Sequence, residues 1–138
     1  MAERVIRAAL VALAFVALSA GLWASVSPRA FYDNYPGLGH AWVAADGPYN
    51  EHLIRDFGAL NLALAVVTIV AAVTLGRAVV IAAAVAWLAF QVPHLVYHVR
   101  HIDVFDTGDK VAVVVGLVAA VVLPIVILVA ESRRTAPT

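Results

Sequence analysis

The chain has 138 residues, of which 64% are hydrophobic and 13% are charged, and its formal net charge at pH 7 is zero. This composition, with a mean hydropathy of +0.95, excludes an ordinary soluble domain and indicates a protein whose solvent is the lipid bilayer. The absence of cysteine excludes disulfides, thiolate metal sites and cysteine nucleophiles. No run of basic residues favours nucleic acid as a partner.

Apolar stretches long enough to cross a bilayer recur four times along the chain. A hydrocarbon core of roughly 30 Å needs about 20 apolar residues in helical form. We therefore predict an all-α, integral membrane four-helix bundle with up-and-down connections. It forms a single transmembrane domain over residues 1–138, with helices at about 6–26, 51–75, 78–99 and 111–131. The first apolar run follows Arg4 and Arg7, as in a signal peptide, but it is longer than such a segment needs, so we expect a retained helix.

The first connection, residues 27–50, is the longest, and it is rich in aromatic and turn-forming residues. Its prolines and glycines predict turns, and its five aromatic residues are unusual for a disordered linker. Aromatic rings are favoured at the membrane interface. We therefore predict an ordered cap over one end of the bundle, followed by Asn50 as the N-cap of the second long helix.

Arginine and lysine are distributed unequally between the two sides of the predicted bundle. One side holds the arginines near both termini and Arg77 in the tight second connection, and the other holds Arg29, Arg55, Arg100 and Lys110 among many acids. The excess of positive charge in short cytoplasmic segments predicts that both termini are cytoplasmic and that the cap is extracytoplasmic. A multi-pass protein of the plasma membrane is the expected location.

Two polar clusters are expected at the cap side of the bundle. Around the start of the second helix, Glu51 and Arg55 are spaced i, i+4, as are His52 and Asp56, so each could form a partner pair. Asn61 lies about one turn deeper and needs an interhelical partner or water. The third helix ends with three histidines on one face, His94, His98 and His101. Tyr97 lies among them. Antiparallel packing of these helices predicts that the two clusters meet.

Imidazole and carboxylate groups together suit first-row metals such as zinc, manganese, iron or copper. The sequence therefore raises the hypothesis of a metal site, with haem or quinone binding less favoured. Its candidate ligands are His52, His94, His98, Glu51 and Asp56, and its supporting residues are Arg55, Asn61, Tyr97 and His101. The competing interpretation is that these side chains are hydrogen-bonded polar ends of the bundle. Glu51 and Arg55 in particular are typical of a structural ion pair.

The order of elements resembles a known group of membrane proteins. The chain is similar in this order to the small DoxX-like four-helix membrane proteins. The similarity rests on residues 22–31, an intervening loop, and Arg55-Asp56-Phe57-Gly58 entering a helix rich in leucine and alanine. The resemblance covers the architecture of the whole chain. Because that group includes proteins linked to oxidoreduction and quinone chemistry, the resemblance implies a similar role here.

Three functional hypotheses remain open from the sequence. The first is a metal- or cofactor-binding component of an oxidoreductase, and the second is a noncatalytic accessory protein that binds a partner or lipid. The third is a small oligomeric transporter, which is disfavoured because the helix interiors carry few polar residues. Small residues at Gly116 and Ala120, and at Ala17 and Gly21, suggest a homodimer face or a place in a larger membrane complex.

Overall fold

The computed structural model describes residues 1–134, which fold into helices and their connections without a strand. Four helices are long and apolar enough to span a bilayer, and they support a multi-pass membrane protein. They are α1 (Ala2–Val26), α4 (Glu51–Thr74), α5 (Arg77–Arg100) and α6 (Thr107–Arg134). α1 begins nearer the N-terminus than predicted, and α6 extends at both ends, because charged residues at interfacial ends are compatible with helix.

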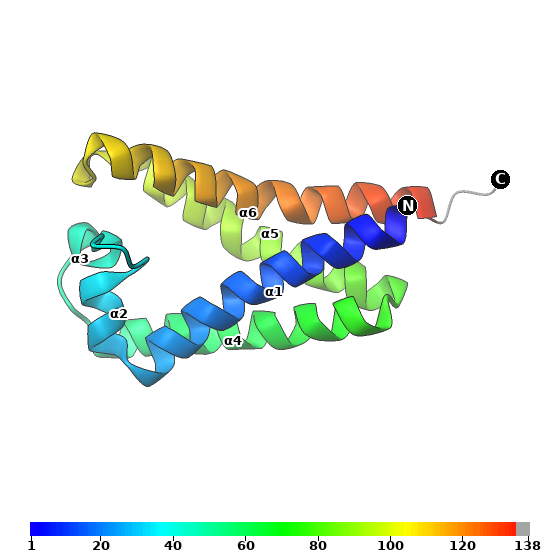
Figure 1. Cartoon of the computed structure of the whole chain (residues 1–138), viewed down its shortest axis with the longest axis horizontal. Coiled ribbons are helices and arrows are strands. Elements are labelled where there is room, and N and C mark those ends of the chain that lie inside the picture. The colour runs from blue at the N-terminus through cyan, green and yellow to red at the C-terminus, as the bar shows by residue number, and fades with distance from the viewer. Residues whose placement is uncertain (135–138) are drawn as a thin grey trace.

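The four long helices are arranged as two leaning pairs. α1 packs along α4 and α5 packs along α6, and successive long helices run in alternating directions (Figure 1). The N-terminus and the end of α6 therefore lie at one end of the bundle, and the segment between α1 and α4 covers the other (Figure 1). We call the covered end the cap end. There, α4 diverges from α5 and α6, and the cap lies beside the space between them (Figure 1).

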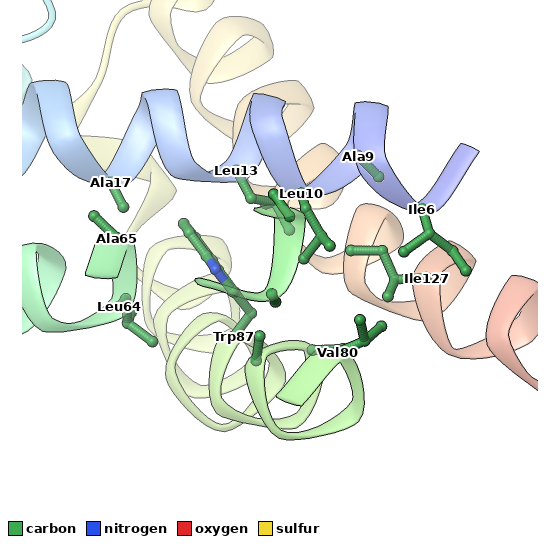
Figure 2. Close-up of a cluster of buried hydrophobic side chains, with 14 residues drawn as sticks. Ile6, Ala9, Leu10, Leu13, Ala17, Leu64, Ala65, Val80, Trp87 and Ile127 are labelled. Carbon is green, nitrogen blue, oxygen red and sulfur yellow. The ribbon is translucent and has the colours of Figure 1, made fainter. Parts of the chain in front are cut away.

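The main hydrophobic core lies in the half of the bundle away from the cap, where it surrounds Trp87 (Figure 2). Trp87 is fully buried. Its indole N–H donates to the Thr68 hydroxyl at 2.8 Å, and that hydroxyl donates to the Leu64 carbonyl at 2.6 Å. An N–H in an apolar interior needs such a partner, so this bond joins α4 to α5 within the core.

Close backbone approach defines the α1–α4 interface. A Cβ placed on Gly58 would lie against the Ser25 hydroxyl and 2.8 Å from the Ser25 backbone nitrogen, and one on Gly21 would lie 3.0 Å from Leu62. Arg55 donates from Nη1 to the Ser25 carbonyl at 2.6 Å, which satisfies an acceptor in the last turn of α1. The Arg55-Asp56-Phe57-Gly58 segment thus holds α4 against the end of α1. Gly21, which the sequence suggested for a homodimer face, contacts α4 within the same chain.

The predicted cap is ordered, and it contains two short helices that the sequence did not suggest. They are α2 (Pro28–Asn34), which starts with proline in its first turn, and α3 (Trp42–Asp46). Between them the chain turns through positive φ angles at Gly37, Leu38 and Gly39. Helices of seven and five residues are too short to show apolar periodicity, so the sequence pattern did not predict them.

The opposite end of the bundle is closed by charged residues of α6. Arg134 donates from Nη2 to the Leu75 carbonyl at 2.7 Å, where α4 ends, and lies 3.4 Å from the buried carboxylate of Glu131. A cation at a helix C-terminus is favourable. These contacts tie the end of α6 to the α4–α5 connection.

Candidate functional site

The cap is held to α5 and α6 by two polar contacts. The His40 imidazole lies 2.7 Å from the Asp109 carboxylate at the start of α6, and the Tyr97 hydroxyl of α5 donates to Asp46 of α3 at 3.5 Å. Within the cap, Tyr35 is partly buried, and burial raises the pKa of its phenol, so the ring remains neutral. Polar side chains from α3 are thereby placed beside the end of α5.

The residues that open α4 form the two predicted pairs. Asn50 caps the helix, because its side chain accepts a hydrogen bond from the Leu53 backbone N–H at 3.1 Å. Arg55 donates to Glu51 at 2.9 Å, and His52 lies 3.3 Å from Asp56. The His52 side chain is 88% exposed. These pairs satisfy one another on the surface of α4, which is how exposed i, i+4 pairs usually behave.

His94 and His98 form a separate pair on α5. Their ring centroids are 4.6 Å apart in an edge-to-face arrangement, His94 stacks on Phe90 at 5.4 Å, and His98 contacts Phe105 at 6.0 Å. Asp46 lies close enough to interact electrostatically with both imidazoles. The carboxylate that faces this pair therefore comes from the cap, whereas Glu51 and Asp56 are paired on α4.

Some polar atoms of the cap and of α5 have no hydrogen-bond partner within the described residues. They include His98 Nδ1 on α5 and the indole nitrogen of Trp42 in the cap. Gln91 on α5 is 6% exposed, and its carbonyl oxygen is also unpartnered. Gln91, His94 and His98 recur at i, i+3 and i+7, so they share one helix face. Unpaired polar groups at membrane depth cost several kcal/mol each, roughly, unless a ligand or water satisfies them.

An unbroken chain of ring contacts joins the cap to this face of α5. It runs from Tyr35 to Phe31 of α2, then to Phe57 of α4 and Phe90 of α5, and then to His94, with successive centroids 4.6 to 6.2 Å apart. Contacts of this kind add specificity to apolar packing. The two histidines therefore lie at the end of an aromatic wall that spans three helices.

The two remaining supporting residues bond to their own helices. Asn61 is buried and donates to the Phe57 carbonyl at 2.9 Å, so it uses its own helix where we had expected an interhelical partner or water. His101 stacks on Tyr97 at 4.2 Å, and its Nδ1 lies 2.8 Å from the Tyr97 carbonyl. Because a carbonyl only accepts, this Nδ1 carries the proton. His101 closes the C-terminal end of α5.

The composite metal site predicted from the sequence is not assembled in residues 1–134. These residues contain no group of three or more His, Cys, Asp or Glu side chains placed to hold a metal ion. Two imidazoles on one helix provide two donors, whereas a catalytic zinc site usually has three protein ligands. The donor set at His94 and His98 therefore does not fit a metal held by the protein alone.

The candidate site residues predicted from the sequence did not include Asp46 or Gln91, although Gln91 was placed just below the histidines. No local signal marks Asp46, because its proximity to His94 and His98 depends on how α3 folds back over α5. Gln91 had a detectable signal, since it is a polar residue within an apolar run and is spaced i, i+3 from His94.

Comparison of the chain with known protein families, with curated proteins and with solved structures finds no match.

Proposed function

We propose that this protein binds a redox cofactor under its cap, at His94, His98, Gln91 and Asp46, as a component of a membrane oxidoreductase. The observation that carries the proposal is the unpartnered Nδ1 of His98, a side chain that contacts a second imidazole and interacts electrostatically with Asp46 of the cap. Intramembrane ionisable residues commonly mark functional sites. The resemblance to DoxX-like proteins supports the same role.

The spacing of the unpartnered groups favours an organic cofactor over a bare metal ion. Gln91 and His98 are seven positions apart, which is about 10 Å along a helix at 1.5 Å per residue. Metal–ligand bonds to nitrogen and oxygen are about 2.0 to 2.2 Å long, so one ion cannot serve both side chains. A flat conjugated headgroup with hydrogen-bonding oxygens, such as a quinone, can reach several of these groups while contacting Phe90.

The test is the cofactor content of the purified protein. Wild-type protein in mild detergent should contain near-stoichiometric cofactor, measured by organic extraction with mass spectrometry, by the absorption spectrum and by elemental analysis. His94→Ala and His98→Ala should lose it, because each removes an imidazole of the pair. His52→Ala is the matched control, since it removes a cap-end histidine on α4 and should retain the cofactor.

Two results would contradict the proposal. One is wild-type protein without cofactor whose thermal stability does not change on adding quinone, haem, zinc, iron or copper. The other is equal cofactor content in His94→Ala, His98→Ala and His52→Ala. Elemental analysis could instead find a metal that His94→Ala and His98→Ala lose and His52→Ala retains. That result would favour a metal cofactor over an organic one.

An accessory protein without a cofactor is the second candidate. It is favoured by the fact that His40, His52 and His101 all have partners that stabilise the fold. In that case the histidine pair serves as a polar end of the bundle under the cap.

A transporter receives less support, because the apolar core around Trp87 lies between the polar face of α5 and the other end of the bundle.

We further propose up-and-down insertion in the plasma membrane with both termini cytoplasmic and the cap outside. Leu38 is fully exposed in the cap, and Glu3 is exposed near the N-terminus. In intact cells a membrane-impermeant thiol reagent should modify Leu38→Cys, whereas Glu3→Cys should react only after permeabilisation. Modification of both from outside would overturn the orientation. The native chain has no cysteine to interfere.

A further inference from the structure

A second polar region lies at the cap end, away from the histidine pair. It is an open hollow of about 560 Å³ between α2 and the first turn of α4, and its lining includes Ser27, Arg29, Asp33, Tyr49, Glu51 and Arg55. Ser27 follows the last residue of α1, and Glu51 begins α4, so the hollow lies level with the ends of two candidate membrane spans. In a bilayer this is the depth of the lipid headgroups.

The lining contains two guanidinium groups and two carboxylates, which form two arginine–carboxylate pairs. Arg29 donates to Asp33 at 2.7 Å, and Arg55 donates to Glu51 at 2.9 Å. Tyr49 connects the pairs, because Arg29 lies 5.0 Å from the centre of its ring and its hydroxyl donates to Glu51 at 3.3 Å. Burial and the Glu51 carboxylate raise the pKa of the Tyr49 phenol, so it remains a donor.

Both ion pairs are exposed, and Arg29 has donors that no described residue uses. The side chains of Arg29 and Arg55 are 66% and 49% exposed, and exposed pairs contribute little stability by themselves. Within the described residues, Arg29 uses only Nε in a hydrogen bond. Its terminal nitrogens therefore remain available as donors.

We propose that this hollow binds the headgroup of an aminophospholipid such as phosphatidylethanolamine. Guanidinium groups suit a phosphate, because their donors match its oxygens. The ammonium group can donate to the carboxylate of Glu51 or Asp33. A choline headgroup has no N–H to donate, and an anionic headgroup lacks a cation for the two carboxylates. This proposal is independent of cofactor binding at His94 and His98.

The test uses the full chain, delipidated in detergent and mixed with equal amounts of phosphatidylethanolamine, phosphatidylcholine and phosphatidylglycerol. Retained lipid is measured by native mass spectrometry, and the thermal midpoint is measured with each lipid alone. Wild-type protein should retain phosphatidylethanolamine roughly tenfold over the others, a ratio that corresponds to about 1.4 kcal/mol. Equal retention of the three lipids would overturn the proposal.

Two variants separate the two halves of the headgroup. Arg29→Gln should weaken retention of all three lipids, because it removes a phosphate partner. Glu51→Gln should abolish the preference for phosphatidylethanolamine and increase retention of phosphatidylglycerol. Arg100→Gln, an exposed arginine at the end of α5 and outside the hollow, is the matched control and should behave as wild type. Wild-type retention of the three lipids by Arg29→Gln, or an unchanged preference for phosphatidylethanolamine in Glu51→Gln, would also overturn the proposal.

Discussion

Replacement of Trp87 by alanine is expected to lower the free energy of unfolding by about 3 to 5 kcal/mol, as buried tryptophan truncations do. The indole is fully buried, and it belongs to one buried cluster with residues of α1, α4, α5 and α6, among them Leu10, Leu13, Val80 and Ile127 (Figure 2). Its loss leaves a cavity in the core. Unfolding in detergent, induced by heat or by sodium dodecyl sulfate and followed by circular dichroism, measures the change.

Trp87→Phe separates packing from hydrogen bonding at the same position. Phenylalanine keeps most of the apolar contact but cannot donate to the Thr68 hydroxyl. We expect it to cost about 1 to 2 kcal/mol, the range of strong interhelical hydrogen bonds in membranes. A Trp87→Ala variant within about 1 kcal/mol of wild type would mean that the core does not depend on this side chain, contrary to what its burial predicts.

Replacement of Gly58 by alanine is expected to destabilise the protein by about 1 to 3 kcal/mol, as in other overpacked interiors. The new methyl group would lie 2.8 Å from the Ser25 backbone nitrogen and 3.1 Å from the Gly21 carbonyl oxygen. The Ser25 hydroxyl can rotate away, but backbone atoms cannot, so α1 and α4 must separate. Because Arg55 also bonds to Ser25 across this interface, the change should weaken that contact as well.

Gly116→Ala is the matched control for this prediction. A Cβ at Gly116 would lie within 4 Å of no described atom outside its chain neighbours and the nearby backbone of its own helix, and alanine is the better helix former by about 1 kcal/mol. We therefore expect Gly116→Ala to be neutral or slightly stabilising in the same unfolding measurement. Equal destabilisation by the two substitutions would show that loss of glycine, and not the α1–α4 contact, determines the effect.

The aromatic segment between the first two long helices shows where prediction reached its limit. Its tyrosines, tryptophan and prolines predicted an ordered cap, and the structure contains one. The cap's two helices could not be predicted, because neither spans enough residues for a periodic pattern. The polar pairs at the start of α4 were predictable, since Glu51 with Arg55 and His52 with Asp56 depend only on spacing along one helix.

The predicted metal site, which combined residues of α4 and α5, depended on the distance between the cap ends of these two helices. No local sequence pattern specifies that distance. We expected the ends of α4 and α5 to meet because the helices are antiparallel neighbours, but α5 leans on α6 and diverges from α4 at the cap end (Figure 1). The cap lies beside this space, and its Asp46 takes the place that Glu51 and Asp56 were expected to fill.

By itself, the sequence determined the four apolar spans, the ordered cap and the polar residues at one end, because these follow from hydropathy and from spacing along single helices. Only the tertiary structure decided which polar groups face one another. Close packing at positions such as Gly58 and Trp87 joins α4 to its neighbours. In the described residues the candidate ligands form no group of three or more, and Asp46 of the cap interacts electrostatically with the histidine pair. Side chains from different helices meet only through such packing, which no single segment encodes.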